Sequence, residues 1–109
     1  MDRTQSDIAI IGAGMAGLTC ALALGEQGFA VRVFDKGRGP GGRMAARRAE
    51  IAGEKVSFDH GAQYFAAKSS EFTAQIAAWA GAGVVAPWPA AGEDAWVGVP
   101  GMNGPLRHM

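Results

Sequence analysis

Three glycines and an acid near the N-terminus have the types and spacing needed to hold a nucleotide pyrophosphate and its ribose. Gly12, Gly14 and Gly17 form a G-x-G-x-x-G pattern, and Asp35 follows at close to the roughly 20-residue distance of an acid that binds a ribose diol. In such a pattern the first glycine allows a sharp turn, the second lets a pyrophosphate approach the backbone, and the third lets a helix pack closely on a sheet. Unpaired N–H groups at the helix N-terminus then attract the phosphates. The pattern predicts a dinucleotide-binding turn.

A strand, a helix and a second strand must position these residues. Ile8–Ile11 is a short apolar run, Met15–Gln27 has helical spacing, and Ala30–Phe34 is a second apolar run that ends at the acid. Arg32 interrupts that run, which indicates a strand end or a solvated edge. One side of the helix, expected to face the sheet, carries Met15, Leu18, Leu22 and Gly25. The stretch 7–35 therefore predicts the β–α–β unit of an α/β, Rossmann-like fold.

The composition limits the classes of partner. The 109 residues carry no net formal charge and 49% are hydrophobic, so the chain is globular rather than disordered. Without a basic surplus we expect no nucleic-acid partner. The uncharged stretch 8–25 contains four glycines and lacks a net positive flank, so we expect no membrane association. Cys20 is the single cysteine; we expect it buried in the helix and the protein in the cytoplasm.

The segment after Asp35 is rich in glycine and cations. Residues 36–44 contain four glycines and a proline, which disfavour a helix or a central strand. Lys36, Arg38 and Arg43 lie here, beside the predicted pyrophosphate site. An arginine can hold a phosphate through two hydrogen bonds at once, which suits Arg43. A solvated basic loop is the alternative, but the preceding dinucleotide turn favours contact with a ligand.

The rest of the chain predicts a hairpin and the start of a second lobe. Residues 44–51 and 55–58 indicate two strands around a turn at 52–54, with an exposed, charged surface and no assigned function. Residues 69–80 indicate a helix capped by Ser69 or Ser70, with Phe72, Ile76 and Trp79 on one face. Short strands are expected at 84–85 and 96–99, and a further helix at 105. We expect a nucleotide-binding part at 1–68 and the start of a substrate domain at 69–109.

Three motifs together resemble the renalase-like branch of the flavin amine oxidase superfamily. They are IGAGMAG (residues 11–17), DKGRGPGGRM (35–44) and DHGAQYF (59–65). The resemblance implies FAD as cofactor. It implies that the pyrophosphate is held by Gly12, Ala13, Gly14, Met15, Ala16 and Gly17, the adenosine ribose by Asp35, and the adenosine edge by Lys36. It further implies that Gly42, Arg43 and Met44 lie along the FAD and that Gly61, Ala62, Gln63 and Tyr64 line the flavin ring.

The resemblance also implies an activity. We expect hydride transfer from a small reduced substrate, an amine or a dihydronicotinamide, to the flavin, with reoxidation by oxygen. Only His60 suggests itself as a base, and we assign no catalytic residue and no metal ligand. The chain is short for this family, so we expect it to be the N-terminal part of a longer protein and inactive by itself. Two alternatives remain: an NAD-binding dehydrogenase module, against which the GGRM and GAQYF motifs argue, and a nucleotide-binding fragment without turnover.

Overall fold

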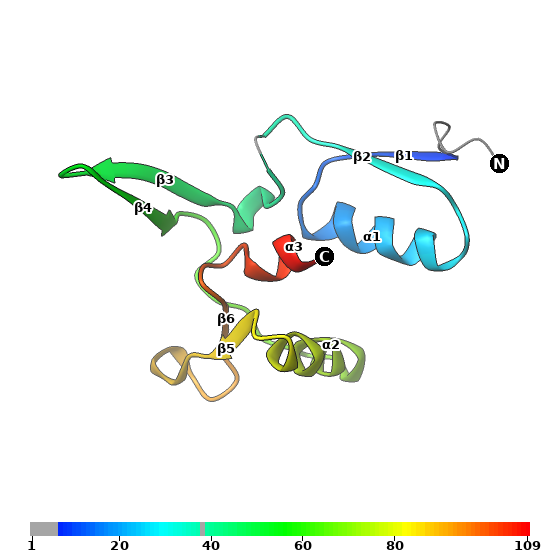
Figure 1. Cartoon of the computed structure of the whole chain (residues 1–109). Coiled ribbons are helices and arrows are strands. Elements are labelled where there is room, and N and C mark those ends of the chain that lie inside the picture. Colours follow the sequence, from blue (N-terminus) through cyan, green and yellow to red (C-terminus); the bar gives the residue numbers. More distant parts are fainter. Residues whose placement is uncertain (1–6, 38) are drawn as a thin grey trace.

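The glycine turn joins a strand to a helix, as its spacing predicts. The computed structural model describes residues 7–37 and 39–109, so Arg38 lies outside the described residues. Strand β1 (Ile8–Ile11) leads into α1 (Met15–Glu26), and β2 (Val31–Phe34) pairs in parallel with β1. Helix α1 lies along one face of this pair (Figure 1). The predicted β–α–β unit of an α/β, Rossmann-like fold is confirmed, with each boundary within one residue of expectation.

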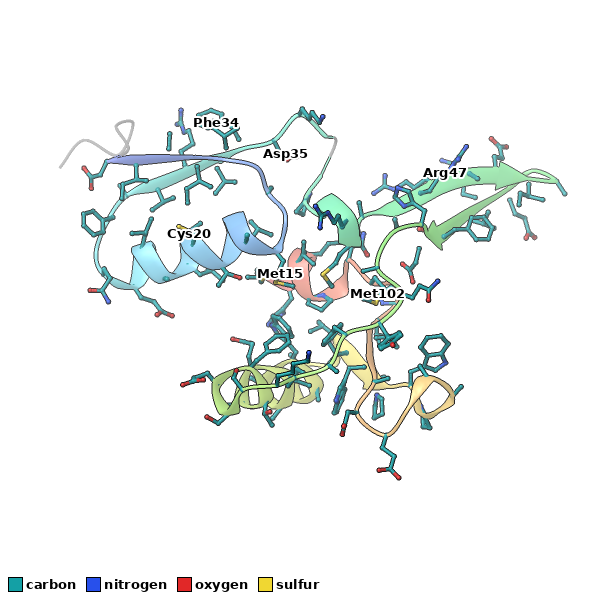
Figure 2. The ribbon with its side chains drawn as sticks, turned by 180° about the vertical axis from the view of Figure 1, so that it is seen from behind. Met15, Cys20, Phe34, Asp35, Arg47 and Met102 are labelled. Atoms are coloured by element: carbon teal, nitrogen blue, oxygen red, sulfur yellow. The ribbon has the colours of Figure 1, made fainter. Side chains whose placement is uncertain are left out.

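The two strands bury one face and expose the other. Ile10 and Val33 are partners in register on the half-buried face toward α1, whereas Ile11 and Phe34 are partners on the exposed face. Figure 2 shows Phe34 on the side of the sheet away from the helix. Arg32 is exposed within β2, which confirms the expected solvated position. The described chain therefore covers the sheet on one side.

Helix α1 turns a different side to the sheet from the one expected. Met15 and Leu18 are half-buried as expected, but Leu22 and Gly25 are exposed. A Cβ on Gly17 would collide with the Gly12 carbonyl oxygen, so Gly17 lies directly on the chain that leaves β1. This contact places the half-buried row of Gly17, Ala21 and Leu24 toward the strands, because residues three or four apart share a helix face. The predicted face was therefore wrong at its C-terminal half.

Cys20 is exposed, so the prediction of a buried thiol was wrong. The residue lies on the flank of α1, next to the row that faces the strands (Figure 2). Within the described residues, the sheet under α1 has two strands. A sheet of that width does not enclose the flank of a helix, whose diameter with side chains is about 10–12 Å.

A hairpin follows the glycine-rich segment and projects from the rest of the molecule (Figure 1). Strand β3 (Ala46–Ile51) pairs in antiparallel fashion with β4 (Glu54–Asp59). Ala52 and Gly53 form the turn with φ of 51° and 83°, the positive values that a two-residue hairpin turn requires. The predicted hairpin is confirmed. Its first strand begins later than expected, because Gly42–Met44 forms a single 3₁₀ turn, η1, in the segment for which we expected no helix.

The second half of the chain builds its own small core. It contains α2 (Ser70–Gly81), β5 (Val85–Pro87), the 3₁₀ turn η2 (Pro89–Ala91), β6 (Trp96–Gly98) and α3 (Gly104–His108). The Ser69 hydroxyl accepts a hydrogen bond from the Phe72 N–H at 3.1 Å, which confirms the predicted cap. Ile76, Trp79 and Val85 form the buried cluster of this half.

The boundary between the two parts at 68/69 stays a prediction. Phe65 precedes it, yet its backbone exchanges two hydrogen bonds of 2.9 Å with Trp96. Phe65 and Ala67 also pack against the Ile76–Trp79–Val85 cluster, and Met15 of α1 contacts the same cluster. The second half therefore recruits residues from both sides of the expected boundary.

The molecule is extended rather than compact. The radius of gyration is 15.7 Å, against roughly 13 Å for a compact domain of this length. The accessible surface is 7950 Å², against roughly 5,700 Å² for a folded monomer of this mass. The folded chain is therefore more extended, and exposes more surface, than a compact domain of its mass. In the described part of the chain, every helix is too short or too polar to cross a bilayer.

We predict that Gly17→Ala destabilises the chain by about 1–3 kcal/mol, because the new methyl group would overpack the Gly12 carbonyl. Gly25→Ala in the same helix is the matched control, since a Cβ there meets no atom within 4 Å. It should stabilise the chain by about 0.5–1 kcal/mol, the usual gain in a helix. Urea unfolding measures both free energies, and equal effects would contradict the close packing of Gly17.

Candidate dinucleotide-binding site

The ends of β1 and β2 and the glycine-rich segment meet at Ala13. The Gly12 N–H donates to the Phe34 carbonyl at 2.6 Å, which extends the strand pairing into the turn. The Ala13 N–H donates to Asp35 Oδ1 at 3.1 Å, and the Ala13 carbonyl accepts from the Gly41 N–H at 2.9 Å. Ala13 is buried between them. One residue of the glycine turn therefore ties together three segments predicted to bind the dinucleotide.

A cleft of about 470 Å³ opens between the glycine turn and residues 41–44; Ala13 and Asp35 lie outside its lining. Gly14 and Gly42 approach closely across it, and a Cβ on Gly42 would lie 3.3 Å from the Gly14 Cα. A side chain at Gly42 would therefore be crowded where the two loops face each other. Most of the predicted pyrophosphate residues share this cleft, which is lined by Ile11, Gly12, Gly14, Met15, Ala16, Gly17, Gly41, Gly42, Arg43 and Met44.

The Asp35 carboxylate stands at the end of β2 (Figure 2). It accepts from the Ala13 N–H and, through Oδ2, from the Gly37 N–H at 2.9 Å. These two bonds, followed by the nearby Lys36 charge, hold the pKa of Asp35 below its ordinary value, because they favour the ionised form. A carboxylate has about four lone-pair sites, so two remain for further donors. Asp35 can therefore accept hydrogen bonds from a ribose diol while it holds the turn.

The motif at residues 61–64 lies against the glycine-rich segment. The Ala62 N–H donates to the Arg43 carbonyl at 2.9 Å, and a Cβ on Gly61 would collide with that oxygen. Tyr64 points elsewhere, with its ring edge-on to Trp88 at a centroid distance of 6.2 Å. The structure thus brings Gly61 and Ala62 to Arg43, while Gln63 is exposed and Tyr64 contacts the second half. The cofactor roles of these residues stay predictions.

Asp59 has a structural role that sequence reasoning missed. Its Oδ1 accepts a hydrogen bond of 2.9 Å from the N–H of Met102, a residue only 1% exposed. Met102 in turn accepts, through its sulfur, from the Gly98 N–H at 3.3 Å. Asp59 comes two residues before Gly61, so it fixes this part of the site to the loop before α3. The partner lies 43 residues away, and the available signal was the acid that begins the DHGAQYF motif.

Titration of Asp35 should report on the turn. Its folded pKa lies below its ordinary value of 3.8, so its stabilisation is complete above the unfolded pKa and is lost as pH falls through the folded pKa. We expect the amide NMR shifts of Ala13 and Gly37 to titrate together with a midpoint below 3.8. In Asp35→Asn both shifts should be flat over that range. Independent midpoints for the two amides would contradict the shared carboxylate.

Asp59→Ala should cost about 1 kcal/mol of unfolding free energy and expose the Met102 amide to hydrogen exchange. Asp59→Asn keeps an acceptor oxygen and should retain most of the protection. Glu54, at the other end of β4, gives the control Glu54→Ala, which removes the same charge from the hairpin tip. Loss of protection at Met102 in the control would show an effect of charge rather than of the bond.

Comparison with known proteins identifies the family of this fold. Residues 10–78 match a family model described as an NAD(P)-binding Rossmann-like domain. Zeta-carotene-forming phytoene desaturase from Myxococcus xanthus is 56% identical over 36 residues, which cover 33% of this chain and 7% of that protein. Thiamine thiazole synthase from Pyrobaculum calidifontis is 54% identical over 49 residues, which cover 39% of this chain and 19% of that protein. Hydroxyneurosporene desaturase from Rhodobacter capsulatus is 41% identical over 44 residues, which cover 40% and 9%.

These similarities cover a small part of each relative. The chain spans no more than 19% of the length of these three proteins. The family model, in contrast, matches more than half of this chain and includes the glycine turn, Asp35 and the hairpin. The chain belongs to the NAD(P)-binding Rossmann-like domain family.

Proposed function

We propose that this chain is the dinucleotide-binding part of an FAD-dependent oxidoreductase similar to the renalase-like flavoproteins. One observation carries the proposal: the three motifs of that resemblance are joined by backbone hydrogen bonds. The Gly41 N–H bonds Ala13, and the Ala62 N–H bonds Arg43. The family match supports a nucleotide-binding module. The names of the two desaturases, and of a heterodisulfide and ferredoxin reductase subunit from Methanococcus maripaludis, support oxidoreductase chemistry.

The residues of the cleft fit the cofactor. Backbone N–H groups at the start of α1 and the exposed Arg43 would hold the pyrophosphate in the cleft that residues 11–17 and 41–44 line. Asp35 would accept from the adenosine ribose, with Lys36 at the adenosine edge. Gly61 and Ala62, held at Arg43, would border the flavin ring of the cofactor, with Gln63 and Tyr64 beyond them.

FAD, when bound, supplies the hydride acceptor. The residues of this chain would bind it, orient it and tune its surroundings, and we assign none of them a proton-transfer step. The substrate would be a small reduced molecule, an amine or a dihydronicotinamide, in a protein that works in the cytoplasm. The alternative is an NAD-binding module, since the same turn and acid serve that cofactor.

A binding comparison separates the two cofactors. With the 109-residue chain, we expect FAD, followed by flavin fluorescence, to bind at least about tenfold tighter than FMN, which lacks the pyrophosphate-linked adenosine. NAD, measured by calorimetry, should bind more weakly than FAD, because NAD lacks the flavin ring that Gly61–Tyr64 would border. Tighter binding of NAD than of FAD would favour the alternative and overturn the proposal.

Asp35→Ala should weaken FAD binding by about tenfold or more, because a charged acceptor of the ribose is lost. Asp7→Ala is the matched control. The Asp7 carboxylate also accepts a backbone N–H across β1 and β2, from Ala30 at 3.1 Å, but at the far end of the strands. It should leave FAD affinity within twofold. Equal losses in the two variants would mean that Asp35 acts through the sheet rather than through the ligand.

A further inference from the structure

A second cleft, of about 620 Å³, lies between the β3–β4 hairpin and the loop that leads into α3. It shares no lining residue with the glycine cleft. Its walls come from segments far apart in sequence: Arg48 and Ser57 of the hairpin on one side, and Asn103 and Arg107 on the other. The Asp59–Met102 hydrogen bond holds these two walls together at one end.

The register of the hairpin gives this cleft a polar wall. Arg48 pairs with Ser57 and Glu50 pairs with Lys55, so these four side chains share one face of the two strands. Arg47 pairs with Phe58 and therefore lies on the opposite face. All four of these residues line the cleft, together with Ala49 and Val56 from the opposite face, whereas Arg47 and Phe58 do not.

The charges in the cleft leave two guanidinium groups without a carboxylate. Three cations line it, Arg48, Lys55 and Arg107, against two acids. Glu50 stands opposite Lys55 in the register, and Asp59 accepts the Met102 N–H. Among residues 7–37 and 39–109, no ion pair within 4.0 Å joins Arg48, Lys55 or Arg107 to an acid. Two cations that face one cleft repel each other, and an anion between them would remove that repulsion.

We propose that this cleft binds a small anion, a carboxylate or a phosphate group, between Arg48 and Arg107. The planar guanidinium fork matches both groups through paired hydrogen bonds. The Ser57 hydroxyl and the Asn103 amide lie in the same lining and can donate to the remaining oxygens. The site does not depend on the proposed function, because it is separate from the dinucleotide cleft.

The test is a titration of the ¹⁵N-labelled chain with inorganic phosphate, and separately with succinate, at constant ionic strength set with chloride. We expect amide shift changes at Arg48, Ser57, Asn103 and Arg107. Arg48→Gln and Arg107→Gln should each weaken binding by about tenfold. Arg47→Gln is the matched control, since it removes the same charge from the next residue on the opposite face. It should change the affinity by less than twofold.

Each outcome decides the proposal. Tighter binding of phosphate or of succinate identifies which anion the site takes, and both results support it. Equal weakening in Arg47→Gln and Arg48→Gln would show attraction to overall charge and overturn it. Shift changes confined to residues 12–17 would place the anion in the glycine cleft and overturn the proposal. Shift changes that do not saturate as the anion is added would overturn it as well. Dispersed amide spectra establish that each variant folds. If Arg48→Gln does not fold, Arg107→Gln tests the site from the other wall.

Discussion

The close contact between Gly17 and the Gly12 carbonyl is the constraint on which the binding site depends. Because the helix backbone lies against the turn at this point, it fixes both the distance of α1 from β1 and the rotation of the helix about its axis. The N-terminus of α1 lies at the glycine cleft, which Met15, Ala16 and Gly17 help to line, so its free N–H groups can meet an anion there. The same contact also leaves Ala13 where Asp35 and Gly41 can reach its backbone. The walls of the glycine cleft thus depend on the close approach of the Gly17 backbone to the Gly12 carbonyl.

The site is assembled mainly through backbone groups. Gly41 bonds Ala13 and Ala62 bonds Arg43, in each case through main-chain N–H and carbonyl groups. This arrangement satisfies polar groups that would otherwise be costly to bury. It also leaves the Arg43 side chain exposed rather than engaged in holding the loops. Small residues at 61 and 62 allow the approach, since any side chain at Gly61 would strike the Arg43 carbonyl. The glycine-rich motifs are thus requirements of packing as well as of ligand binding.

The sequence predicted what depends on local pattern and missed what depends on distant partners. The strands, α1, the hairpin and the Ser69 cap follow from spacing within a few residues, and they are confirmed. The side of α1 toward the sheet was only half right, because apolar spacing alone does not show that Gly17 must touch the turn. The exposure of Cys20 depends on the width of the sheet beneath it, which the helix sequence does not encode. The Asp59–Met102 bond joins residues far apart in the chain, so no local pattern reveals it.

The two kinds of strand in this molecule show why its clefts differ in character. In β1 and β2 both faces carry apolar residues, the pattern of parallel strands that are covered on both sides, and Ile11 is 83% exposed on the uncovered face. In the hairpin one face carries the polar residues Arg48, Glu50, Lys55, Ser57 and Asp59, while the other is mainly apolar, with Ala49, Ile51, Val56 and Phe58 beside Arg47 and Glu54. Alternation of this kind is typical of strands with one wet face. The polar wall of the second cleft is therefore a property of the hairpin sequence itself. Burial of that face against apolar protein would leave its charges unpaired, at a cost that water or an anionic ligand avoids.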